Sequence, residues 1–332
     1  MNNCIGIDVS KSTLNIHISK NNQDLQIENT VAAVKKLYTK LKKIYKKELE
    51  ELVFVYEPTG SYSEMLRKFC ADRSIKCFII NPKQFSNYAK ALGIEVKNDE
   101  VDARVLAQAI VLAKASQIKV PVYDMDVEQI KELMSFYKFT CKQTAQLKGH
   151  LESLVAKAGD SFAIKELRKS IKASKEREKR IIEQVHQLIQ SNADYKKAYE
   201  NITSIIGVGQ IGGIALLHLF LKYPEANQRQ ITSLTGLNPI YRQSGSSLQS
   251  NYKISKSGSI FYRGALFMGV MTAIRYDDNF KAFYERLKAN GKHTTQAQIA
   301  VMRKMIIVAH SLYKNDTQYV KKVPNLEEKT MN

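Results

Sequence analysis

Four carboxylates in the first third of the chain are the side chains best suited to chemistry. Asp8 directly follows the apolar segment 4–7, and Glu57 directly follows the apolar segment 52–56. Asp99 and Asp102 lie three residues apart at the start of a predicted helix, so both can face one side of its first turn. In open α/β sheets the carboxyl ends of the strands converge on one crevice. We therefore expect the four acids to gather there.

Four carboxylates in one crevice repel one another unless cations neutralise them. Hard oxygen ligands suit Mg²⁺, and two such ions about 3.5 to 4 Å apart can activate a nucleophile and stabilise the leaving oxygen in phosphoryl transfer. Each acid alone also fits a structural role, with Asp8 as a turn residue and Asp99 or Glu100 as a helix cap. Their conjunction predicts a site for magnesium, with two ions expected.

A second candidate is a serine-rich loop in the last third of the chain. The segment 243–259 contains seven serines, and a serine in a polar loop is more often a turn former than a nucleophile. The residues alone do not indicate which serine, if any, would react. Upstream, Gly207 and Gly209 in Ile206-Gly207-Val208-Gly209 could let backbone N–H groups approach a phosphate closely.

The charge of the chain favours a polyanionic partner. The net charge is +19, and residues 201–332 carry 17 basic and 7 acidic side chains. The segment 226–276 has no acidic residue, and it is the best candidate for contact with a phosphate backbone, although a solvated basic face fits it as well. Its basic residues are Arg229, Arg242, Lys253, Lys256, Arg263 and Arg275.

Cysteine usage and hydropathy indicate the compartment. The four cysteines form no C-x-x-C pair and no regular metal-ligand spacing, which predicts reduced thiols and no zinc site. The N-terminus does not read as a signal peptide, and the apolar run 205–221 is shorter than the roughly 20 residues of a membrane span. We expect a cytoplasmic, nucleoid-associated protein with no membrane segment.

The elements that would position the acids alternate between strands and helices. Strands are predicted over 4–7, 13–19 and 24–28, a helix over 31–45, a strand over 52–56, a helix over 63–73 and a strand over 77–80. This alternation predicts a largely parallel sheet with helices on its faces, and hence an α/β domain over residues 1–121.

Helical periodicity dominates the rest of the chain. Apolar residues recur at three and four positions between 127 and 192, with a break at Gly159 and Asp160, which predicts a long helical hairpin within a second domain, 122–198. Such a hairpin can pair with a partner subunit or stay intramolecular, and the pattern does not distinguish the two. The third domain, 199–332, is expected to be mainly helical, with helices over 260–274 and 296–313.

Three motifs resemble, in order and spacing, those of the DEDD transposases typified by insertion sequence 110. They are Gly6-Ile7-Asp8-Val9-Ser10-Lys11, then Tyr56-Glu57-Pro58-Thr59-Gly60, then Lys97-Asn98-Asp99-Glu100-Val101-Asp102-Ala103. Downstream, Gly236-Leu237-Asn238-Pro239, Gln243-Ser244-Gly245 and Ile254-Ser255-Lys256-Ser257-Gly258 before Arg263 resemble the family's second block, and Ile206-Gly207-Val208-Gly209 looks like its helix-hairpin-helix-like element.

The resemblance implies a fold, a site and partners. The first domain would be ribonuclease-H-like, similar to the RuvC Holliday-junction nuclease, with Asp8, Glu57, Asp99 and Asp102 as metal ligands. Ser244 would be the nucleophile, and Arg242 could stabilise the charge at the phosphate under attack. The chain would cut and exchange donor and target DNA, guided by an RNA from the element. Because strand exchange requires several active sites held together, we expect a homodimer or homotetramer.

Several alternatives stay open on the sequence. An actin-like ATPase or sugar kinase also opens with a strand and an aspartate, although its phosphate turn needs glycine where Val9-Ser10-Lys11 has none. A DNA-binding repressor would leave the four acids unexplained. A site-specific invertase similar to the Piv group shares both motif blocks, and a RuvC-like nuclease without transposition shares the first.

Overall fold

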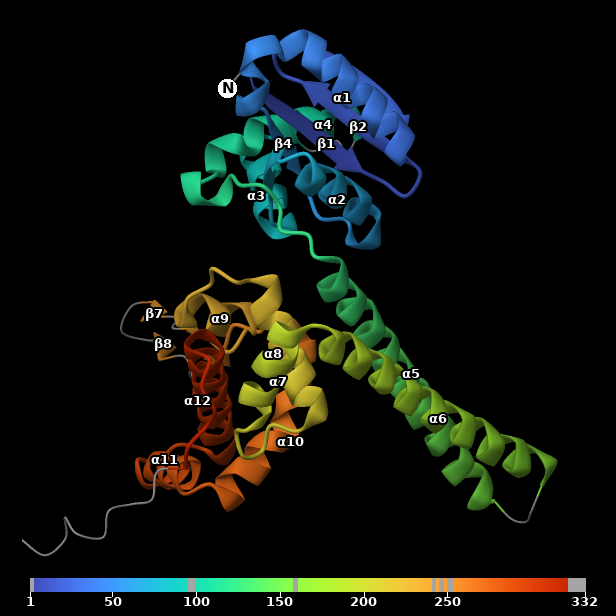
Figure 1. Cartoon of the computed structure of the whole chain (residues 1–332), viewed down its shortest axis with the longest axis vertical. Helices are drawn as coiled ribbons and strands as arrows, with labels where there is room; N and C mark the ends of the chain where they lie inside the picture. Colours follow the sequence, from blue (N-terminus) through green and yellow to red (C-terminus); the bar gives the residue numbers. More distant parts are fainter. Residues whose placement is uncertain are drawn as a thin grey trace, which may run out of the picture. The chain divides into compact units, whose positions relative to one another are not determined.

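The chain folds into two compact units. The computed structural model describes residues 3–94, 99–157, 161–240, 243–244, 248–249 and 253–321, and the side chains of residues 99, 100, 243, 244, 248 and 249 lie outside this description. The first unit is Met1–Asp124 and the second is Met125–Asn332 (Figure 1). The first is an α/β unit and the second is mostly helical, as the sequence predicts.

The first unit is built on a mixed five-stranded sheet in the order β3-β2-β1-β4-β5. Its strands are β1 (Cys4–Val9), β2 (Thr13–Ile18), β3 (Gln23–Glu28), β4 (Val53–Tyr56) and β5 (Lys76–Ile79). Strands β1, β4 and β5 are parallel, while β1–β2 and β2–β3 are antiparallel. The prediction of a largely parallel sheet was therefore wrong for its first half. Short turns can join only antiparallel neighbours, and the connections β1–β2 and β2–β3 are short turns.

Helices cover both faces of this sheet. The side chains of Ile5, Ile7, Phe54 and Tyr56 enter one core with α1 and α2, while Cys4, Val53 and Val55 enter the core that α3 and α4 share. Alternate residues of a strand point to opposite faces, so α1 and α2 lie on one side and α3 and α4 on the other. The elements are α1 (Val31–Tyr45), η1 (Lys46–Glu51), η2 (Gly60–Ser63), α2 (Glu64–Asp72), α3 (Pro82–Ala91), α4 (Asp99–Gln108), η3 (Ala109–Leu112) and η4 (Ala115–Gln117).

The second unit opens with two long helices that pack against each other, where the apolar periodicity predicts them (Figure 1). These are α5 (Met125–Val155) and α6 (Phe162–Ser191). The interface also contains a buried polar layer, in which the Thr144 Oγ1 and Ser174 Oγ atoms lie 2.7 Å apart. The predicted break at Gly159 and Asp160 lies outside the described residues.

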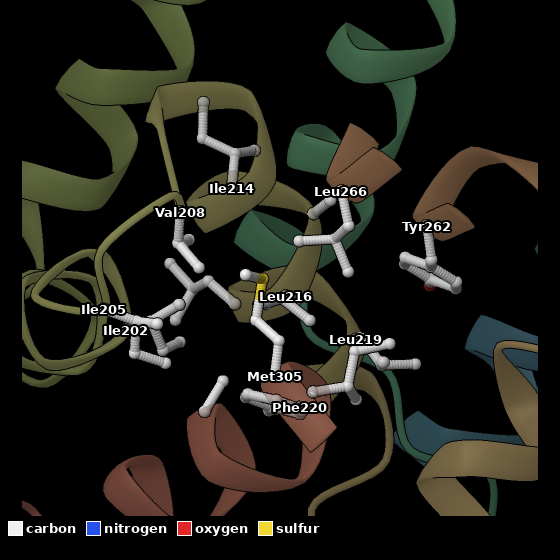
Figure 2. Close-up of a cluster of buried hydrophobic side chains, with 14 of the residues drawn as sticks. Ile202, Ile205, Val208, Ile214, Leu216, Leu219, Phe220, Tyr262, Leu266 and Met305 are labelled. Atoms are coloured by element: carbon white, nitrogen blue, oxygen red, sulfur yellow. The ribbon is translucent and has the colours of Figure 1, made fainter. Parts of the chain in front are cut away.

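The remaining helices surround α8 (Gln210–Lys222), whose apolar side chains are almost all buried. In Figure 2, Leu216, Leu219 and Phe220 of α8 lie among Ile202, Leu266 and Met305 from three other segments. The other helices are α7 (Ala193–Thr203), α9 (Gln228–Leu234), α10 (Ile260–Tyr276), α11 (Asp278–Ala289) and α12 (Thr294–Asn315). Among the helices of the described residues, none has the length and apolarity needed to cross a membrane.

Candidate active site

Two of the four predicted acids lie at the ends of neighbouring parallel strands. In the register of β1 and β4, Ile7 is opposite Tyr56, so Asp8 and Glu57 are the next residues along each strand. Asp8 alternates with Cys4 and Glu57 alternates with Val55, which places both acids on the face covered by α4. Both side chains are partly buried.

Helix α4 approaches this face so closely that only glycine fits beneath it. A Cβ on Gly6 would lie 1.9 Å from the backbone oxygen of Ala103 and 2.6 Å from the backbone nitrogen of Ala107. Asp102 directly precedes Ala103 and is partly buried. The first turn of α4 therefore carries Asp102 to the same face of the sheet as Asp8.

The fourth acid, Asp99, is the first residue of α4, but its side chain lies outside the described residues. Within the described part of the chain, no group of three His, Cys, Asp or Glu side chains is arranged to hold a metal ion. The complete tetrad therefore stays a prediction.

A buried asparagine that sequence reasoning missed lies opposite Asp8. Asn15 pairs with Asp8 across β1 and β2 and is only 3% exposed. Its Oδ1 accepts a hydrogen bond from Gln26 Nε2 at 2.9 Å, while its Nδ2 has no hydrogen-bond partner. Asn15 and Gln26 also line a cavity of about 70 Å³ beside Ala103. A buried donor without a partner costs roughly 1 to 3 kcal/mol of folding free energy. Folding stability therefore does not explain why an asparagine occupies this position.

A charged network ties α4 to the far edge of the sheet. Arg104 Nε donates to Asp24 Oδ2 at 2.9 Å, and His17 Nδ1 lies 2.7 Å from Asp24 Oδ1. The hydrogen bond from Arg104 is the main cause that lowers the pKa of Asp24, and His17 adds to it. Because Arg104 is two residues from Asp102, this network positions the helix that carries the acid.

A second missed residue, Asn29, joins the loops that follow β1 and β4. Its Nδ2 donates to the backbone oxygen of Ser10 at 2.9 Å and to that of Tyr62 at 3.1 Å. One loop begins just after Asp8 and the other just after Glu57. Nothing in the local sequence marks this role, since Asn29 reads as an ordinary residue of a turn before a helix.

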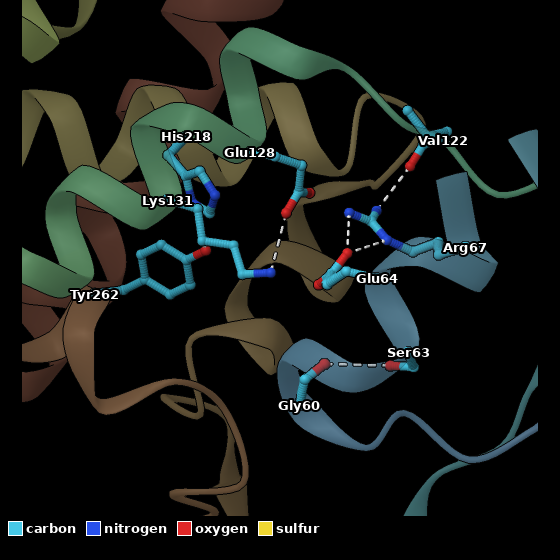
Figure 3. A network of polar contacts seen from close by, with 9 residues as sticks. All are labelled: Gly60, Ser63, Glu64, Arg67, Val122, Glu128, Lys131, His218 and Tyr262. Carbon is cyan, nitrogen blue, oxygen red and sulfur yellow. Dashed lines mark hydrogen bonds and ion pairs between the residues drawn. The ribbon is translucent and has the colours of Figure 1, made fainter. Parts of the chain in front are cut away.

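The turn after Glu57 is closed by its own contacts. Gly60 has a φ of +54°, which glycine adopts without strain, and Ser63 Oγ donates to its backbone oxygen at 3.2 Å (Figure 3). In the same view, Arg67 of α2 donates to Glu64 at 2.8 Å and to the backbone oxygen of Val122 at 2.9 Å.

The predicted nucleophile lies in a small antiparallel ladder of the second unit. Ser244 is in β7 (Gln243–Ser244), opposite Leu248 in β8 (Leu248–Gln249). Its side chain lies outside the described residues, and so does Arg242. Their predicted roles are therefore untested by the geometry.

The base of this loop is packed backbone against backbone. Strands β6 (Pro239–Ile240) and β9 (Lys253–Ile254) pair, and a Cβ on Gly258 would lie 2.0 Å from the backbone oxygen of Leu234. Arg263 Nη1 donates to the backbone oxygens of Thr235 at 2.7 Å and Gly258 at 3.0 Å. This guanidinium therefore holds the loop base together.

The other predicted phosphate contacts differ in exposure. Lys253 and Lys256 are exposed, and Lys256 has a φ of +54°. Gly207 has a φ of +94°, and a Cβ there would lie 2.3 Å from the backbone oxygen of Gly269, so α10 covers it. Gly209 is the N-cap of α8 and has no atom within 4 Å of the Cβ position.

One buried histidine in this unit has a strongly lowered basicity. His218 Nδ1 lies 3.0 Å from the hydroxyl of Tyr262, and its Nε2 has no hydrogen-bond partner (Figure 3). Burial is the main cause that lowers the pKa of His218 to about 4. The side chain is therefore neutral near pH 7.

Two family models match the chain. Residues 5–159 match a family described as transposase, and residues 199–285 match the transposase family IS116/IS110/IS902. The first range contains all four predicted acids, and the second contains Ser244 and the loop base.

Curated relatives point the same way. The chain is 25% identical over 331 residues to the pilin gene-inverting protein of Moraxella bovis, covering 96% of this chain and 98% of the relative. The pilin gene-inverting protein of Moraxella lacunata matches to the same extent. An insertion element IS110 protein of 43.6 kDa from Streptomyces coelicolor is 27% identical over 126 residues, which is 37% of this chain and 30% of that protein.

Proposed function

Because the chain belongs to the IS110 family of transposases and is a DNA recombinase, we propose that it moves an insertion sequence by cutting and rejoining DNA at a two-part site. One part is the set of carboxylates in the first unit, and the other is Ser244 in the second. The observation that carries the proposal is the placement of Asp8, Glu57 and the first turn of α4 on one face of the sheet.

The donor set fits a divalent cation. Asp8, Glu57 and Asp102 offer carboxylate oxygens on one face, and the spacing of Asp99 adds a fourth. Oxygen donors of this kind suit Mg²⁺, and two ions are proposed because paired ions serve both oxygens of a phosphoryl transfer. Bound there, the metal would supply charge stabilisation to the phosphate and its leaving oxygen.

Ser244 is proposed to form the covalent link to DNA. Its hydroxyl loses a proton as Oγ attacks a backbone phosphorus, a P–O bond to the deoxyribose breaks, and the departing oxygen takes up one proton, so that no proton is gained or lost overall. The phosphoserine diester keeps the bond energy for rejoining, which recombination needs. The family motif and the basic composition of this region support the assignment, and Arg242, two residues before Ser244 in the sequence, is proposed to stabilise the developing charge.

The carboxylate part can be tested without the serine. Asp8→Asn and Asp102→Asn should each abolish strand cleavage in Mg²⁺ and leave the unfolding transition intact, because both side chains remain nearly the same size. Asp72→Asn, which changes an exposed acid of α2, is the matched control and should cleave normally. Cleavage at the wild-type rate by either test variant would remove the acids from the mechanism.

Partners and location follow as proposals. Strand exchange needs more than one active site, so we expect a homodimer or homotetramer on DNA, with the α5–α6 hairpin as the predicted oligomerisation region. The family resemblance implies an element-encoded guide RNA and association with the nucleoid. Light scattering of the chain with and without nucleic acid tests the oligomeric state, and a search for a structured RNA encoded beside the gene tests the guide RNA.

Inversion is a second candidate because the two pilin gene-inverting proteins match almost the entire chain. Transposition and inversion share the same cutting and joining steps and differ in the DNA ends. Recombination assays on a plasmid with two sites decide between them, since inversion keeps the segment in the plasmid and transposition moves it elsewhere.

A further inference from the structure

The outer side of α1 and the start of η1 form a lysine surface. It consists of seven lysines within residues 31–47, a stretch with no acidic residue: Lys35, Lys36, Lys40, Lys42, Lys43, Lys46 and Lys47. Six of them are exposed, and Lys40 is partly exposed. The sequence predicts nucleic-acid contacts in the last third of the chain, not in this helix.

The geometry of α1 orders these lysines into rows. Val34, Leu37 and Leu41 face the core, so the lysines occupy the opposite side. Lys36, Lys40 and Lys43 follow one another at spacings of four and three residues, which puts neighbouring side chains about 5 to 6 Å apart on the helix surface. Phosphates follow one another along a nucleic-acid strand, so a row of cations of this kind suits a strand backbone.

Carboxylates do not neutralise this surface within the described part of the chain, where none of the seven lysines forms an ion pair. Two acids just after these lysines are engaged elsewhere, since Glu48 pairs with Lys20 at 2.5 Å and Glu51 accepts a hydrogen bond from Asn3 at 2.8 Å. Like charges three and four residues apart destabilise a helix by roughly 0.2 to 0.5 kcal/mol per pair. A polyanion bound here would remove that cost.

Arg73 adds one further positive charge beside this surface, on the same aromatic ring as Lys42. Lys42 Nζ lies 5.0 Å from the centre of the Tyr38 ring, and the guanidinium of Arg73 lies 5.8 Å from the same ring. Aromatic rings attract cations weakly and leave their charge in place. The lysine surface therefore extends from α1 to the end of α2.

The lysine surface lies on the opposite side of the sheet from the candidate active site. Helix α1 packs on the face reached by Ile5 and Ile7, whereas Asp8 and Glu57 face α4. A DNA strand bound at the carboxylates is separated from α1 by the sheet. The lysines would therefore contact a separate segment of nucleic acid.

We propose that the lysine surface binds the phosphate backbone of a duplex DNA segment other than the one cut at the carboxylates. Lysine is a point charge on a flexible stem, and it contacts phosphates without reading base edges. Recombination joins two DNA segments, and a sequence-independent contact behind the active site would hold the second one. This inference rests on the proposed function only in taking DNA as the substrate.

Binding of a 30-base-pair duplex DNA to the full chain in EDTA tests the proposal, because binding then does not depend on cleavage. The variant carries Lys36→Gln, Lys40→Gln, Lys43→Gln and Lys47→Gln, since glutamine keeps helix propensity close to that of lysine. Each lost phosphate contact lowers the slope of log affinity against log salt by about 0.9, so we expect a decrease of about 2 to 4 and affinity at 0.1 M salt at least tenfold weaker.

The matched control removes the same total charge from exposed lysines that already pair with carboxylates. It carries Gln at Lys169, Lys179, Lys197 and Lys321. Replacing the four α1 lysines by arginine should restore the wild-type slope. The proposal fails if the α1 glutamine variant keeps the wild-type slope, if the control loses as much, or if only binding to an RNA duplex of the same sequence weakens.

Discussion

Replacing Gly6 by alanine is the sharpest test of how α4 is positioned. The added Cβ would lie 1.9 Å from the backbone oxygen of Ala103, whereas real Cβ atoms essentially never come within 3.0 Å of such a neighbour. Helix α4 must therefore move by about 1.1 Å or the strand must bend. Neither neighbour can yield locally, because both contact atoms belong to the backbone.

The expected effects are separable. Overpacking of this kind costs about 1 to 3 kcal/mol of stability. This cost exceeds the roughly 0.5 to 1 kcal/mol by which alanine, with less conformational entropy to lose on folding, would otherwise stabilise a strand relative to glycine. A displacement of about 1 Å at a catalytic group can slow a reaction about 100-fold. Because Asp102 directly precedes Ala103, we expect the cleavage rate to fall about 100-fold in a chain that is still folded.

Two assays measure these effects on the full chain. The urea midpoint gives the change in stability, and the initial rate of strand cleavage at saturating Mg²⁺ gives the change in activity. Gly149→Ala in α5 is the control, since no atom lies within 4 Å of its Cβ position, and it should leave cleavage unchanged. A Gly6→Ala protein with wild-type stability and wild-type cleavage would refute the reasoning.

Three further changes have distinct expected outcomes. Asn29→Ala should lower the free energy of unfolding by about 1 to 3 kcal/mol and slow cleavage, as urea unfolding and cleavage rates would show, because the segments that follow β1 and β4 lose their shared donor. His218 has a folded pKa of about 4, below its unfolded value near 6.5, so the unfolded chain binds one more proton between these pH values. Stability should therefore fall by about 2 kcal/mol as the pH is lowered from 7 to 5. Thermal melts measure this loss, and His218→Gln should flatten the pH profile. Gln at Lys253 and Lys256 should each lower the salt slope of DNA binding by about 1, whereas Arg263→Gln should destabilise the chain and leave the slope alone. A pH-independent melt, or a slope that follows Arg263 instead, would contradict these assignments.

The sequence predicted the elements well where local periodicity decides them. The apolar spacing of Val34, Leu37 and Leu41 and the cap at Thr30 define α1, and the observed helix Val31–Tyr45 has the predicted bounds. The capped helix α11 went unpredicted although Asp277 accepts hydrogen bonds from Asn279 N and Phe280 N at its start. Phe280, Phe283, Tyr284 and Leu287 recur there at helical spacing, so the sequence carried a signal for this helix that was missed.

Close packing could not be read from spacing alone, whereas the short connections between the first three predicted strands already indicated antiparallel pairing. The role of Gly6 depends on a helix nearly a hundred residues later in the chain. Asn29 and Asn15 acquire their roles only through such long-range contacts. The hydrogen bonds of Arg263 to Thr235 and the packing of Gly207 against Gly269 are likewise long-range contacts, and the predicted contacts of both residues with nucleic acid stay predictions.

The most direct test of the account is to identify the residue that becomes joined to DNA. The full chain is incubated in Mg²⁺ with DNA that spans the element's ends, together with the adjoining transcript, then denatured, digested and sequenced by mass spectrometry. We predict a nucleotide on the peptide that contains Ser244, absent in Ser244→Ala and in Asp8→Asn and present in Ser246→Ala and Ser247→Ala. A link at another serine, or complete cleavage with no protein-bound nucleotide, would contradict the two-part site.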